Sequence, residues 1–69
     1  MRPQWTALWE DQFVRIRGQL RGERAAGMRP RLGMRDYSDE AIDRYSRREA
    51  NKRAEEAINR HNEKIGKAA

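Results

Sequence analysis

The sequence has no cysteine and only one histidine, His61. Disulfide bonds are therefore excluded, and a structural zinc site has too few Cys and His ligands. The chain also lacks a nucleophile–base pair, a phosphate-binding loop and a carboxylate dyad of the kind that active sites are built from. We therefore expect a non-enzymatic protein with no metal or cofactor.

Large apolar residues are scarce. Leu, Ile, Val and Phe together account for nine of the 69 residues, well below the ~20% under which charged sequences tend to be disordered. A chain of this size hides only about 60% of its unfolded surface on folding. We therefore expect residues 1–69 to form one small domain whose own core is small or incomplete. A protein partner or a second copy of the chain would complete it.

Long apolar runs are also lacking. The longest uncharged stretch, residues 3–9, is far too short to span a bilayer, and no hydrophobic region of a signal peptide is recognisable. We expect a soluble, non-secreted protein, located in the cytoplasm or within a particle.

Strand patterns are missing, because no segment alternates apolar and polar residues over a strand length. Helical spacing is present instead. An apolar stripe with intervals of four, four, three and four predicts a first helix over residues 4–24; its members are Trp5, Trp9, Phe13, Ile16 and Leu20. Ser38, followed by two acidic residues, is a typical helix start, and Gly66 is a typical stop. The prediction is an all-α fold with two unequal helices, 4–24 and 38–65.

The connector between these helices, residues 25–37, is rich in arginine, glycine and proline. From Arg15 to Arg35 the chain carries seven arginines, no lysine and one acid, Glu23. We expect Met28, Leu32 and Met34 to pack against the first helix, with the neighbouring arginines pointing outward. The candidate partner-binding or anion-binding residues are Arg17, Arg21, Arg24, Arg29, Arg31 and Arg35.

The second helix has a weak apolar stripe that changes direction. Ile42 and Tyr45 lie on one side, whereas Ile58 and Ile65 lie on nearly the opposite side. We expect the first pair to contact one element and the second pair to make a helix–helix contact with another, such as a different chain. Ion pairs at four-residue spacing should support this helix by ~0.2–0.5 kcal/mol each: Glu40–Arg44, Asp43–Arg47, Glu49–Arg53, Glu56–Arg60 and Glu63–Lys67.

Two interpretations of the arginines remain open. Guanidinium groups pair with phosphates, and six phosphate contacts to duplex DNA would give a log–log salt slope of about −5. Guanidinium groups pair equally well with the carboxylates of a protein partner. No recognised DNA-binding or RNA-binding motif is present, and the connector is too long for a tight helix-turn-helix. Any nucleic-acid binding would therefore be non-sequence-specific.

The tryptophan end of the apolar stripe has three interpretations. It forms core against the Ile42–Tyr45 side of the second helix, it docks into another protein as a hot spot, or it lies on a membrane surface. Glu10 and Asp11 disfavour the membrane. From these features we expect a small binding or structural subunit that docks into a larger assembly. The composition is analogous to that of components of nucleoprotein or viral particles. The alternative is a stand-alone DNA-binding or RNA-binding protein that uses the Arg15–Arg35 segment.

Overall fold

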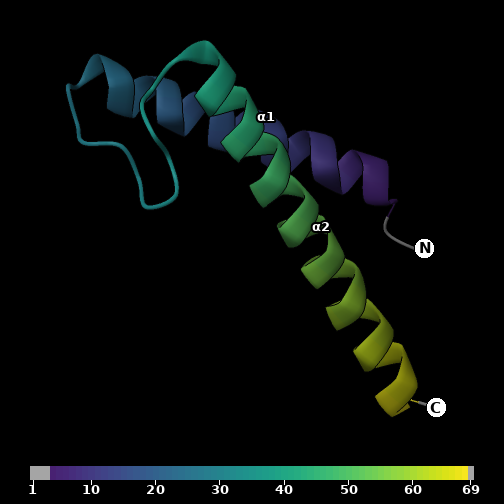
Figure 1. Cartoon of the computed structure of the whole chain (residues 1–69). Coiled ribbons are helices and arrows are strands. Elements are labelled where there is room, and N and C mark those ends of the chain that lie inside the picture. The colour runs from purple at the N-terminus through teal and green to yellow at the C-terminus, as the bar shows by residue number, and fades with distance from the viewer. Residues whose placement is uncertain (1–3, 69) are drawn as a thin grey trace.

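The chain folds as a hairpin of two helices. The computed structural model describes residues 4–68, without the side chains of Ile65, Lys67 and Ala68. Helix α1 spans Trp5–Ala25 and helix α2 spans Asp39–Ala68, and no strand occurs within the described range. The predicted all-α fold of two unequal helices is therefore confirmed. Figure 1 shows that α2 starts beside the far half of α1, crosses it and then extends beyond it.

The end of α2 differs from the prediction. The helix continues through Gly66 to Ala68, although the sequence predicted that it would stop at this glycine. A glycine inside a helix costs about 1 kcal/mol relative to alanine but does not block the helical backbone. No proline follows to prevent continuation.

The core lies where the helices cross. Ile16 and Leu20 of α1 and Ile42 of α2 are completely or almost completely buried, and Met34, Tyr37 and Tyr45 pack against them. The distal half of the apolar stripe of α1 therefore forms core against the Ile42–Tyr45 side of α2. The sequence had assigned this contact to the tryptophan end of the stripe, and that assignment is wrong, because the helices cross near Ile16 and Leu20. In the part of the chain that the structure describes, only three large apolar side chains are completely or almost completely buried, which agrees with the small core expected from the composition.

The buried face of α2 is continuous. Ile42, Ser46, Ala50 and Ala54 are all buried, and Arg53 Nη1 donates a hydrogen bond of 3.1 Å to Gln12 Oε1 of α1. One row of buried residues therefore runs from Ile42 to Ala54, and the expected change of direction concerns the residues beyond it, Ile58 and Ile65. Every fourth residue of an α-helix is displaced by about 40° around the axis. A row of such residues winds around the helix and faces one neighbour that crosses it at an angle.

Both ends of the connector are closed by local hydrogen bonds. At the end of α1, Gly27 N–H donates to Arg24 O and Met28 N–H donates to Glu23 O, at 3.1 and 3.0 Å. Gly27 has a φ of 70°, so this is a helix end of the type that favours glycine. At the start of α2, Ser38 Oγ accepts a hydrogen bond from Ala41 N–H at 3.2 Å, which confirms the predicted cap.

The connector differs from the prediction in which of its side chains are exposed and which are buried. Leu32 is 99% exposed and Met28 is 56% exposed, so only Met34 packs against the core as predicted. Met34 N–H donates to Arg31 O at 2.9 Å, which places Leu32 at the corner of a turn with Gly33 at a φ of 91°. A corner residue projects into solvent. Arg31, which was expected to point outward, is instead partly buried.

Candidate anion-binding and docking surfaces

Glu23 organises the inner side of the connector. Arg31 Nε lies 3.0 and 3.1 Å from the two carboxylate oxygens of Glu23, and Arg31 Nη2 donates a further hydrogen bond to Oε2. The Tyr37 hydroxyl lies 2.9 Å from Glu23 Oε1 and 2.8 Å from Arg29 O, and can donate its hydrogen to either. One carboxylate on α1 therefore holds both a turn residue and the segment that leads into α2.

This cluster shifts the pKa of each member. The Arg31 hydrogen bond, supported by Tyr37, lowers the pKa of Glu23. The same contact raises the pKa of Arg31, while burial and the Glu23 hydrogen bond raise the pKa of Tyr37. All three shifts favour the protonation states that hold the cluster together near neutral pH.

A second ion pair ties the two helices together. Arg24 Nη1 lies 2.8 Å from Asp39 Oδ1, which joins the last turn of α1 to the first residue of α2. The Arg24 hydrogen bond lowers the pKa of Asp39. Two of the six candidate arginines, Arg24 and Arg31, thus contact carboxylates of the same chain.

The other four candidate arginines are available to a ligand. Arg21, Arg29 and Arg35 are exposed, and Arg17 lies over the ring of Phe13 with 5.1 Å between its Cζ and the ring centroid. Within residues 4–68, none of the four forms an ion pair. The structure does not gather them into one site, because they are distributed along α1 and the connector.

The first half of the α1 stripe forms an aromatic stack, which consists of Trp5, Trp9 and Phe13. The ring centroids of Trp5 and Trp9 are 6.4 Å apart, and those of Trp9 and Phe13 are 5.0 Å apart with nearly parallel planes. Trp9 and Phe13 are half-buried, whereas Trp5 is 40% exposed. This end of the stripe therefore presents aromatic surface to solvent, unlike Ile16 and Leu20.

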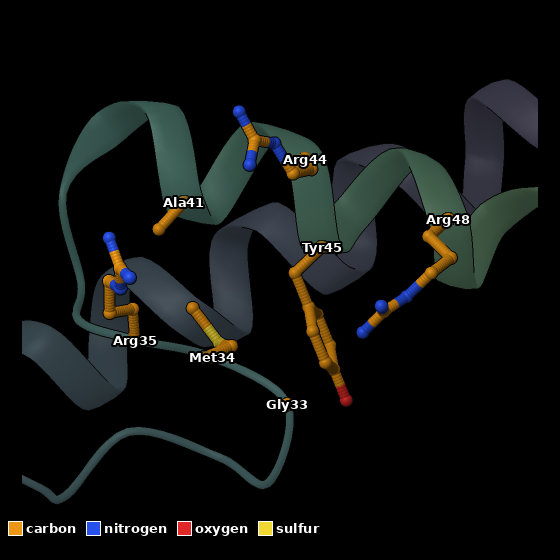
Figure 2. A pocket seen from close by; sticks show the side chains of 7 residues that line it. All are labelled: Gly33, Met34, Arg35, Ala41, Arg44, Tyr45 and Arg48. Carbon is orange, nitrogen blue, oxygen red and sulfur yellow. The ribbon is translucent and has the colours of Figure 1, made fainter.

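A shallow pocket of about 310 Å³ lies between the connector and α2. We call it the arginine pocket. The connector contributes Gly33, Met34 and Arg35, and α2 contributes Ala41, Arg44, Tyr45 and Arg48. Figure 2 shows Arg35 on the connector side and the other two arginines on the α2 side. Arg48 lies over the ring of Tyr45 at 5.6 Å, and Arg31 lies 5.9 Å from the same ring.

Sequence reasoning selected Arg35 but missed Arg44, Tyr45 and Arg48 as site residues. Arg44 and Arg48 are one helical turn apart, and this spacing was available in the sequence. Arg44 was assigned instead to an ion pair with Glu40. Among the described side chains of α2, only Asp43–Arg47 of the predicted pairs lies within ion-pair distance, at 2.9 Å. Arg53 turns to Gln12 of α1 rather than to Glu49.

The predicted helix–helix contact through Ile58 and Ile65 stays a prediction. Ile58 is half-buried in the second half of α2. The side chain of Ile65 lies outside the described residues.

Neither helix of the described chain has a stretch long and apolar enough to cross a membrane. Within the same range, no cluster of His, Asp and Glu side chains has an arrangement that could hold a metal ion. Comparison with protein-family models, with curated proteins and with solved structures finds no match to the chain.

Proposed function

We propose that the protein is a non-enzymatic docking subunit of a larger assembly, and that the aromatic stack is its contact with a protein partner. The observation that carries this proposal is the exposure of the stack. Trp5 keeps 40% of its surface accessible in a chain with very few large apolar residues. Tryptophan and arginine are the residues most enriched in the energetic centres of protein interfaces.

The surroundings of the stack indicate the chemistry of the partner. Arg17 lies over Phe13, and Arg21 follows one turn later on α1 without an ion pair among the described residues. Such a surface is complementary to an apolar groove bordered by carboxylates. The aromatic rings would fill the groove and the guanidinium groups would pair at its edge, which sets orientation more than affinity.

The long second helix supports the same role. Beyond the crossing point, α2 diverges from α1 and extends away from it as an arm (Figure 1). This arm gives the hairpin a length of 49 Å against widths of 20 and 17 Å. An elongated molecule of this kind offers a large contact surface relative to its mass, as expected of an assembly component.

The proposal is tested by photo-crosslinking in the cells that produce the protein. A photoreactive phenylalanine analogue replaces Trp5 in one variant and Ala7 in the other; Ala7 is exposed on the same helix but lies outside the stack. We expect one specific protein adduct from position 5 and none from position 7. Adding Arg17→Glu to the position-5 variant should weaken that adduct.

The same adduct pattern from both positions, or no protein adduct from position 5, would contradict the docking role. Circular dichroism of each variant shows whether the helices are retained. We further expect Trp9→Ala to impair docking or folding more than any single arginine substitution in the connector, because it removes the middle ring of the stack.

A second candidate function is non-sequence-specific binding of DNA or RNA. It is favoured by the four candidate arginines that form no ion pair within residues 4–68. If only these four contact phosphates of duplex DNA, the log–log salt slope should be about −3.5, shallower than six contacts would give. Titration of nuclease-treated protein onto DNA and RNA at several salt concentrations measures this slope. Negligible binding at ~50 mM salt would exclude the second candidate.

A further inference from the structure

Three arginines from two separate elements line the arginine pocket. Arg35 comes from the connector, and Arg44 and Arg48 come from consecutive turns of α2. Within the described chain, none of the three forms an ion pair, and no carboxylate lines the pocket. Three like charges around one hollow repel one another, and this repulsion is relieved when an anion binds between them.

The nearby carboxylates are mostly engaged elsewhere. Glu23 pairs with Arg31, Asp39 with Arg24, and Asp43 with Arg47. Asp36 Oδ1 accepts a hydrogen bond from Ser38 N–H at 2.9 Å. Glu40 precedes Arg44 by one turn yet does not pair with it among the described contacts. Hydrogen bonds from Ser38, with help from Arg35, lower the pKa of Asp36, but none of the three pocket arginines is held in an ion pair within the described chain.

The local backbone is shaped to bring the connector close to Arg48. Gly33 has a φ of 91°, a conformation that other residues rarely adopt. A Cβ atom at this position would lie 3.2 Å from Arg48 Nη2. Tyr45 holds Arg48 on its other side through the ring contact at 5.6 Å, which orients the guanidinium without using its hydrogen-bond donors.

We propose that the arginine pocket binds a phosphate group. Each guanidinium presents a planar fork of donors, so three of them exceed what the two oxygens of a single carboxylate accept. A phosphate monoester has three terminal oxygens and a charge of about −1.5 to −2 near neutral pH, so it matches three cations better than a carboxylate does. This site is separate from the aromatic stack, and it uses two arginines outside the Arg15–Arg35 segment.

The test is an NMR titration of the full chain with inorganic phosphate, with acetate and with a short single-stranded oligonucleotide. We expect saturable shifts of the Gly33, Met34 and Arg35 amides and of the Arg44 and Arg48 Nε–H signals. Arg44→Ala and Arg48→Ala should each weaken phosphate binding about tenfold, the value of one lost charge-assisted hydrogen bond. Acetate should bind more weakly than phosphate.

Arg60→Ala is the matched control, because it removes the same charge from the same helix. It lies sixteen residues beyond Arg44, or about 24 Å along the axis, and at 0.15 M salt the Debye length is only about 8 Å. We expect Arg60→Ala to change phosphate affinity less than twofold. An equal loss in Arg60→Ala and Arg44→Ala would overturn the proposal, since it would indicate general attraction to a basic chain.

A second pair of variants leaves the charge unchanged. Gly33→Ala and Gly27→Ala both place a side chain at a positive φ, but only the first puts a Cβ against Arg48; at Gly27 no atom lies within 4 Å. Gly33→Ala should weaken phosphate binding more than Gly27→Ala. Equal effects would contradict the role given to the shape of the pocket.

The three ligands distinguish the sources of the phosphate. Saturation by inorganic phosphate indicates a small phosphorylated ligand, whereas shifts of the same signals by the oligonucleotide alone indicate a nucleic-acid backbone. Acetate binding as tight as phosphate binding, or no saturable shift with any ligand, would overturn the proposal. None of these outcomes bears on the crosslink at position 5, so the docking role and the phosphate site can fail independently.

Discussion

At the residue scale, the most consequential side chain is Glu23, the single acid between Arg15 and Arg35. It accepts the fork of Arg31 and lies within hydrogen-bond distance of Tyr37. Because the carboxylate is near the end of α1, these contacts pull the connector back onto the helix. Some arginines of this segment therefore stabilise the fold, in addition to any ligand that others bind. Part of the positive charge of the segment is neutralised inside the chain.

The first residue-scale prediction concerns acid. The folded chain lowers the pKa values of Glu23 and Asp39, so on acidification the unfolded chain binds protons first. Their stabilising contribution is complete above the unfolded values, about 4.3 for Glu and 3.9 for Asp. It is lost as the pH falls through the lower folded values. We expect the midpoint temperature of unfolding to decrease once the pH is lowered below about 5. Circular dichroism melts between pH 7 and pH 2 measure this decrease.

Glu23→Gln should lower the midpoint at pH 7 by several degrees and flatten this acid-induced fall. Glu10→Gln is the control on the same helix, since Glu10 forms no side-chain hydrogen bond or ion pair among the described contacts. An identical acid profile for wild type and Glu23→Gln would show that Glu23 does not stabilise the connector.

The second residue-scale prediction compares Ser46, which lies within α2, with Ser38, which caps this helix. Ser46 is completely buried and its hydroxyl has no hydrogen-bond partner among the described residues, so Ser46→Ala removes an unsatisfied polar group and should stabilise the chain by about 1 kcal/mol. Ser38 caps α2 through Ala41 N–H, so Ser38→Ala should destabilise it by about 1 kcal/mol. Chemical denaturation measures both. Destabilisation by Ser46→Ala would indicate that its hydroxyl has a partner in solution.

At the scale of elements, the two helices are held together by large residues at one end of their contact and small residues at the other. Ile16, Leu20 and Ile42 fill the crossing region, while Ala50 and Ala54 are buried further along α2. Small side chains let the backbones approach closely, and the Gln12–Arg53 hydrogen bond lies in the same region. The first half of α1 lies outside this core, and its aromatic rings are partly exposed.

The element-scale prediction enlarges one of these small residues. Ala54→Leu should destabilise the hairpin by about 1–3 kcal/mol, because a buried position without free space cannot take the extra volume. Ala7→Leu makes the same change at an exposed position of α1 and should have little effect. Thermal unfolding of both variants provides the comparison. Equal stability of the two would mean that α1 does not cover Ala54 in solution.

At the scale of the whole molecule, the hairpin is long and thin, with a core of three large residues. A chain of this size rarely gains more than a few kcal/mol from one core. Its net charge of +5 adds repulsion. The composition and the structure thus agree that the isolated hairpin is marginally stable, which is consistent with the proposed place in an assembly.

The whole-molecule prediction is a broad thermal transition of low cooperativity for the isolated monomer. Circular dichroism at several protein concentrations, together with sedimentation, measures the transition and the oligomeric state. A sharp melt of a proven monomer would contradict the claim that a partner completes the core. A midpoint that rises with concentration would identify the chain itself as the partner.

The sequence by itself determined the two helices and all but one of their limits to within a residue, because spacing, capping and glycine act through neighbouring residues. The stripe from Trp5 to Leu20, the Ser38 cap and the break at Gly27 each specify local backbone, and each agrees with the structure. The stop at Gly66 was wrong because one glycine only lowers helix propensity. For the candidate site, the sequence located the arginines but not their partners.

Only the tertiary structure decided which arginines turn inward and which remain available to a ligand. Arg31 meets Glu23 and Arg24 meets Asp39 across eight and fifteen residues, distances over which no local pattern carries information. The arginine pocket likewise exists only because the connector returns beside Arg44 and Arg48. A guanidinium group pairs with whichever carboxylate the fold brings within reach. The path of the connector, rather than the count of arginines, therefore decides where the positive charge is exposed.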